Sequence, residues 1–132
     1  MEFRHYPPVD ERGAERLRVA AVAWAPLLGA LHSAGFRPYL ELQHGQAEDP
    51  LRIYCELDDD LLLDLSIEDG GIPDTAPEWL DGEWAAFVQD ADGDYLAEIL
   101  IDAGTDYRAL AGKLRDLIDS VAVGERPMFE IW

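Results

Sequence analysis

The chain has 132 residues, in which 28 Asp and Glu face only 10 Lys and Arg, so its formal charge is −18. This length fits one domain, and a hydrophobic content of 48% is too high for an intrinsically disordered chain. Anionic membranes and nucleic-acid backbones bind through clusters of Lys and Arg, so the composition argues against both as direct partners.

The N-terminal quarter predicts an extended lead-in followed by an interrupted helix. Residues 1–9 contain two adjacent prolines, which block a helix. Asp10 suits a helix N-cap, and apolar residues recur at helical spacing from there to Leu31. Pro26 lacks a backbone N–H, so we expect a kink or a restart of the helix there, and Gly35 suits a helix stop.

Two β-hairpins are predicted next, from segments in which apolar and polar side chains alternate. These segments are 36–42, 53–57, 61–67, 84–90 and 95–101. Acidic residues 58–60 form the tip of the first hairpin, and residues 91–94 form the turn of the second. Residues 72–82 predict a loop that contains one short helical turn around Pro77.

A last helix and a tail complete the predicted domain. An apolar stripe runs from Tyr107 to Val121, and Gly124 ends it. The tail spans residues 125–132, and its alternating part, Met128 to Trp132, is expected to add an edge strand or to dock on the sheet. Strands joined by short turns form an antiparallel sheet. We therefore predict a single α+β domain over residues 1–132, with an antiparallel sheet of about five strands and an N-terminal and a C-terminal helix on one face.

Most of the negative charge lies in one segment. Residues 53–107 hold 17 of the 28 acids and no Lys, Arg or His, whereas the rest of the chain holds 11 acids and 10 bases. Two unit charges about 10 Å apart repel by roughly 0.4 kcal/mol in water, so such a block costs several kcal/mol unless a basic partner relieves it. This segment therefore predicts a surface that binds a basic protein.

Nothing in the sequence predicts export or membrane insertion. The longest apolar run, Val19 to Leu31, contains a proline and a glycine and is too short to span a bilayer. The N-terminus lacks a cationic start followed by an apolar core and a cleavage site. We therefore expect a cytoplasmic protein, and its single cysteine rules out an internal disulfide framework.

One acidic turn invites a calcium interpretation. Asp90, Asp92 and Asp94 bring three carboxylates together, but an EF-hand loop needs a glycine at its sixth position and a glutamate at its twelfth. This chain has Tyr95 and Ile101 at those positions. A hairpin tip is the better interpretation.

The cysteine and the histidines also give no indication of a catalytic or metal site. Cys55 alternates with Ile53 and Leu57, which indicates a small buried core residue and not a nucleophile. The three histidines are scattered, and none has the i, i+4 partner of a helical metal site. We therefore expect no metal, no cofactor and no enzymatic activity.

The segment from Pro77 to Trp84 is the predicted contact site. It mixes Trp79, Leu80 and Trp84 with three acids, and interfaces favour aromatic anchors surrounded by polar groups. The alternative is that Trp79 and Leu80 cap the sheet core and that Trp84 begins a strand. The outward-facing acids of the strands extend the predicted partner-binding surface: Asp64, Glu68, Glu98 and Asp102.

The order of elements is similar to that of a known group of small acidic proteins. The elements that carry this similarity are the helix Leu17 to Leu31, the strands Tyr39 to Leu42, Arg52 to Leu57, Leu61 to Ile67, Trp84 to Asp90 and Tyr95 to Ile101, and the helix Tyr107 to Val121. Their order, together with the length and the acidity, resembles the small type III secretion chaperones and the related YbjN-like proteins. The resemblance implies a dimer that binds another protein and has no catalytic activity.

Three functions remain open. The first is a non-enzymatic, chaperone-like module that binds a basic or partly unfolded protein. The second is an immunity or inhibitor protein, or a nucleic-acid mimic, that blocks a basic toxin, nuclease or other nucleic-acid-binding protein, because charge complementarity speeds such association. The third is a metal-dependent or carboxylate enzyme, which requires a pocket with converging acids.

Overall fold

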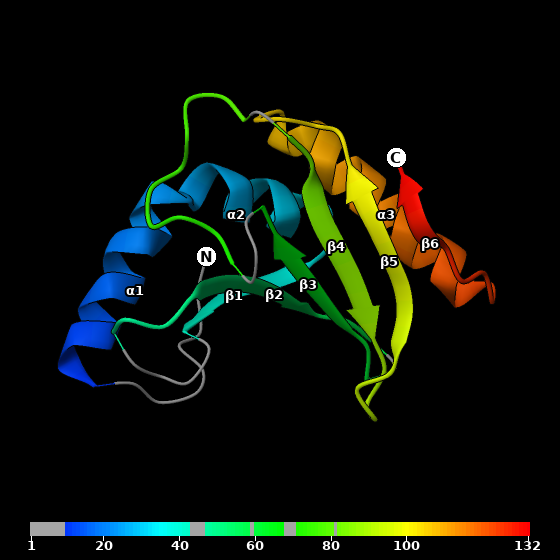
Figure 1. The fold of residues 1–132 in the computed structure, drawn as a ribbon, viewed down its shortest axis with the longest axis horizontal. Helices are drawn as coiled ribbons and strands as arrows, with labels where there is room; N and C mark the ends of the chain where they lie inside the picture. The colour runs from blue at the N-terminus through cyan, green and yellow to red at the C-terminus, as the bar shows by residue number, and fades with distance from the viewer. Residues whose placement is uncertain (1–9, 43–46, 59, 68–70, 81) are drawn as a thin grey trace.

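The structure is a computed structural model that describes residues 10–42, 47–58, 60–67, 71–80 and 82–132. Over these residues the elements, in chain order, are α1 (Glu11–Ala23), α2 (Ala25–Ser33), β1 (Arg37–Leu42), β2 (Leu51–Glu56), β3 (Leu62–Ser66), β4 (Trp84–Gln89), β5 (Tyr95–Ile101), α3 (Tyr107–Ala122) and β6 (Met128–Ile131). Figure 1 shows the helices packed behind one twisted sheet. The predicted α+β class is confirmed.

The strands lie in the sheet in their chain order, β1 to β6. Each pair from β1 to β5 is antiparallel, whereas β6 runs parallel to β5. The predicted antiparallel sheet is present in β1–β5, and over the described residues the tail adds β6 as a sixth, parallel strand, which is one of the two roles expected of it. The reason is that α3 carries the chain back across the sheet, and such a crossover delivers the next strand parallel to the one before it.

The interrupted N-terminal helix has the predicted boundaries. The Asp10 carboxylate accepts a hydrogen bond from the Gly13 N–H at 2.7 Å, which caps α1. Trp24 ends α1 and begins α2, and Pro26 occupies the first turn of α2, where its missing N–H costs nothing. Gly35 follows α2 with φ +92°, a conformation that L side chains rarely adopt.

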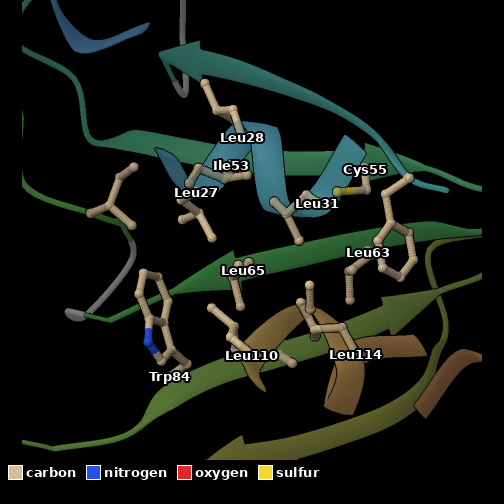
Figure 2. Packing of buried hydrophobic residues seen from close by; sticks show 14 of the residues in the cluster. Leu27, Leu28, Leu31, Ile53, Cys55, Leu63, Leu65, Trp84, Leu110 and Leu114 are labelled. Carbon is tan, nitrogen blue, oxygen red and sulfur yellow. The ribbon is translucent and has the colours of Figure 1, made fainter. Parts of the chain in front are cut away.

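The core lies between the helices and one face of the sheet (Figure 2). Leu27, Leu28 and Leu31 of α2 and Leu110 and Leu114 of α3 pack over strand residues, which include Ile53, Cys55, Leu63, Leu65 and Trp84. These strand residues alternate with those of the opposite face, as the period of a strand requires. No described helix covers that opposite face, which we call the open face.

The connection between β3 and β4 differs from the prediction. Its described residues 71–80 contain bends and no helical turn. Ile72 bridges Leu51 of β2, and the Pro73 carbonyl accepts a hydrogen bond from the buried Trp24 indole at 2.8 Å. These tertiary contacts join the start of the connection to β2 and to Trp24, between α1 and α2. The predicted lead-in, residues 1–9, lies outside the described residues.

Candidate functional site

The two tryptophans of the predicted contact segment have opposite environments. The Trp79 side chain is 70% exposed, whereas Trp84 is completely buried. Trp84 is the first residue of β4 and faces the core, where its indole N–H donates to the Gly104 carbonyl at 2.8 Å and its ring meets Trp24 edge to face. Leu80 is half-buried against the same core. Of the three predicted anchors, Trp79 alone is therefore fully available to a partner, and Trp84 is excluded.

Asp64 does not lie on a solvated face as predicted. It points to the open face, but its side chain is only 7% exposed and forms an ion pair with Arg52 at 2.8 Å. Its cross-strand neighbours are Tyr54 and Phe87, whose rings flank it on both sides. Large neighbours therefore bury a carboxylate that strand alternation alone would leave in water.

Other polar groups surround this ion pair. Glu41 lies opposite Arg52 in the register of β1 and β2, and burial raises the pKa of Glu41 to about 7, with Arg52 opposing the shift. Burial also raises the pKa of Asp64, which Arg52 partly offsets. The pKa of Tyr54 rises to about 12 because of burial and the nearby Asp64 charge. Among the described residues, Asp64 Oδ1 has no hydrogen-bond partner.

Arginines from outside the acidic segment neutralise part of it. Besides the Arg52–Asp64 pair, Arg16 binds both Asp74 oxygens, at 2.7 and 2.8 Å. Arg37 reaches Asp58 at 3.4 Å, where Asp58 is nearly fully exposed. The fold therefore places arginines from outside the segment beside Asp58, Asp64 and Asp74, so the chain itself compensates part of the charge for which a basic partner was predicted.

Three exposed acids of this segment lie in two turns at one end of the sheet. Asp60 lies in the turn between β2 and β3, and Asp92 and Asp94 lie in the turn between β4 and β5. Since β3 is antiparallel to both β2 and β4, the two turns share one end of the sheet (Figure 1). We call this end the acidic end.

The calcium interpretation of the second turn gains no support. The Asp90 carboxylate accepts hydrogen bonds from the N–H groups of Asp92 and Asp94, at 2.9 and 3.0 Å. It therefore closes the hairpin, as an aspartate does in a tight turn. In the part of the chain that the structure describes, no three His, Cys, Asp or Glu side chains gather as they would around a metal ion.

An apolar groove crosses the open face near the C-terminus. It has a volume of about 300 Å³. Its walls come from β4, β5 and β6, and the apolar residues that line it are Ala85, Phe87, Ile99, Leu100, Phe129 and Ile131. Phe129 is 83% exposed, Ile131 67% and Leu100 40%. The Phe87 ring extends the apolar surface toward Tyr95, at 5.7 Å between ring centroids.

Of the predicted acids, Glu98 lies in this groove. It is half-buried, opposite Phe87 in the sheet register. Asp102 is exposed just after β5, where its N–H donates to the Trp132 carbonyl at 3.0 Å. The fourth predicted acid, Glu68, lies outside the described residues. The structure therefore joins Glu98 to a surface formed by residues that were not predicted.

Sequence reasoning missed Phe87, Leu100, Phe129 and Ile131 as a common surface. One signal was available: β4 and β5 are apolar on both faces, which is more than a solvated outer face requires. The alternating tail also indicated an edge strand. The sequence did not show which strand the tail would join, because only the crossover through α3 places β6 beside β5.

The remaining findings assign no chemistry. Cys55 is completely buried, and burial raises the pKa of its thiol to about 12, as expected of a core residue. None of the described helices is long and apolar enough to cross a membrane. No family model, curated protein or solved structure matches the chain.

Proposed function

We propose that this protein is a non-enzymatic binding module that holds apolar, basic segments of a partly unfolded partner protein in the open-face groove. The observation that carries the proposal is the groove itself. Phe129, Ile131 and Leu100 expose apolar surface to water beside a carboxylate, Glu98. Exposed apolar side chains gathered in one place are typical of a surface that binds another molecule.

The charge of the module favours a basic partner. With 28 acids against 10 bases, the protein attracts cationic chains over several ångströms and repels other acidic proteins. Apolar contacts then supply affinity at short range, where charge supplies rate and selectivity. This combination suits a partner that presents both kinds of residue on one extended segment, which is the chaperone-like role inferred from the sequence.

The test compares two forms of one basic protein. Reduced and alkylated ribonuclease A, which stays unfolded, is titrated into the full chain at low salt, and the native disulfide-bonded form is titrated in parallel. We expect the unfolded form to bind more tightly, and Phe129→Asn to weaken that binding. Phe129 has φ +56°, which Asn tolerates, so this variant removes the ring without disturbing the backbone.

Trp79→Ala is the control, because Trp79 is also an exposed aromatic residue but does not line the groove. We expect it to leave the binding unchanged. Failure of the unfolded form to bind at low salt rules out the proposed function.

A second candidate, an inhibitor of a folded basic protein, is favoured by the acidic end. Asp60, Asp92 and Asp94 project from neighbouring turns, as a surface that covers a cationic site would require. Replacing these three with Asn distinguishes the candidates. An inhibitor loses its binding to a folded basic protein, whereas the proposed groove keeps its binding to an unfolded one.

A further inference from the structure

The outer side of β6 is an open sheet edge. β6 is the last strand of the sheet, and in the described chain no strand follows it (Figure 1). Leu100 is the register partner of Ile131, and the Leu100 carbonyl accepts from the Trp132 N–H at 2.7 Å. Successive residues of a strand turn their backbone groups to opposite sides, so the N–H and C=O of Ile131 point away from β5. Such groups form a template for another strand.

The edge is continuous with the apolar groove. Phe129 and Ile131 belong both to β6 and to the wall of the groove. Phe129 holds a left-handed backbone, with φ +56°, next to a register shift between Glu98 and Ile99. A non-glycine residue with such a φ is uncommon and is found more often at binding sites. The strained residue is also the most exposed large apolar residue described, at 83%.

The side chains along the edge follow a simple order: apolar Phe129, acidic Glu130, apolar Ile131. Glu130 is exposed, and no ion pair joins it to another described residue. Cross-strand pairs are most stable between apolar residues and between opposite charges. The complement of this strand is therefore an extended segment with a basic residue between two apolar ones.

A second copy of the chain fits the edge poorly. Two β6 strands paired across a two-fold axis bring the same short segment together, so the two Glu130 carboxylates lie close to each other. Like charges on neighbouring strands are destabilising, and each copy also carries a net charge of −18. A basic incoming strand is instead attracted both by Glu130 and by the net negative charge of the chain.

We propose that an extended apolar–basic–apolar segment of the partner adds to β6 as a further strand of the sheet. Its backbone pairs with Ile131, its two apolar side chains cover Phe129 and Ile131, and its basic side chain meets Glu130. Strand addition of this kind takes affinity from backbone hydrogen bonds and specificity from alternate side chains. The inference rests on the proposed function and specifies how the groove holds its segment.

The test uses a defined probe, the peptide acetyl-Arg-Val-Arg-Val-Arg-Val-Arg-amide with a fluorescent label, and the full chain. Binding is followed by fluorescence anisotropy. The same peptide with N-methyl groups on alternate residues keeps its side chains and loses the N–H donors of one edge; both methylation frames are tested. We expect one frame to bind at least about tenfold more weakly than the parent, because strand pairing needs those donors.

Charge reversal tests the side-chain pairing. Glu130→Lys should weaken the binding of the arginine peptide about tenfold, and it should improve the binding of the matching glutamate peptide relative to the native chain. Glu125→Lys makes the same change in charge just outside β6 and is the control, with a clearly smaller effect expected on both peptides. Amide hydrogen exchange at Ile131 should slow on binding, as a newly paired N–H requires.

The outcomes separate the two proposals. If both methylated peptides bind as tightly as the parent while Phe129→Asn still weakens binding, then strand addition is wrong and the groove stands. If neither the peptide nor unfolded ribonuclease A binds, both proposals are wrong. If sedimentation shows a dimer that Glu130→Lys alters, then the edge pairs with a second copy, and the proposed occupant is wrong.

Discussion

Removing one member of the buried Arg52–Asp64 pair should cost far more stability than removing an exposed acid. The two side chains are 18% and 7% exposed, and Nη1 and Oδ2 lie 2.8 Å apart. At an effective dielectric constant of about 20, charges about 4 Å apart attract by roughly 4 kcal/mol, and the cost of removing both charges from water opposes that attraction. Asp64→Asn keeps the shape but leaves the guanidinium without its counter-charge. We expect a loss of about 3 kcal/mol in the free energy of unfolding.

Urea denaturation followed by tryptophan fluorescence measures this loss. Asp92→Asn is the control, because it removes the same charge from an exposed turn, and we expect a change within about 0.5 kcal/mol. The double variant Arg52→Met/Asp64→Leu should come within about 1 kcal/mol of the native chain, since apolar residues can replace a buried ion pair. A native-like Asp64→Asn variant, or a double variant as unstable as the single one, would refute this reasoning.

Three further predictions follow from burial. The pKa of Glu41 is raised in the folded state from 4.5 to about 7, so between these pH values the folded protein binds more protons than the unfolded chain. The free energy of unfolding should therefore fall as the pH rises from 4.5 to 7. Urea titrations at each pH measure this slope, and Glu41→Gln should flatten it. Trp84→Ala should cost about 3–5 kcal/mol in urea denaturation and Trp79→Ala less than about 1, and equal losses would contradict their assigned environments. The Cys55 thiol should react with iodoacetamide only as fast as the chain unfolds, so rapid labelling of the folded protein would contradict its burial.

Most of the fold could be predicted from local sequence patterns. The Asp10 cap, the restart at Pro26 and the stop at Gly35 all depend on neighbouring backbone groups, so they can be predicted from a few residues. The strand alternation identified the buried face for the same reason, because the period of two is a property of each strand. The helical turn expected around Pro77 was wrong: residues 71–80 contain bends and no helical turn, and tertiary contacts join Ile72 and Pro73 to Leu51 and Trp24.

The candidate site depended on pairings over long distances in the chain. Glu98 was predicted as an outward acid, and the structure places it in a groove with Phe129 and Ile131, which belong to the tail. Asp64 was predicted in the same way and is buried beside Arg52. Asp64 and Glu98 occupy the same kind of position in an alternating strand, and their surroundings differ because different strands lie on either side of them.

The amino-acid sequence alone determined the amphipathic elements, the face that each strand buries and the acidity of the chain, because these depend on composition and on spacing along the backbone. Only the tertiary structure decided which carboxylates meet an arginine and that β6 lies beside β5 as an open edge. The ion pairs depend on strand register and on the packing of α1, and the position of β6 depends on the crossover through α3. Those bring together side chains that no local pattern connects.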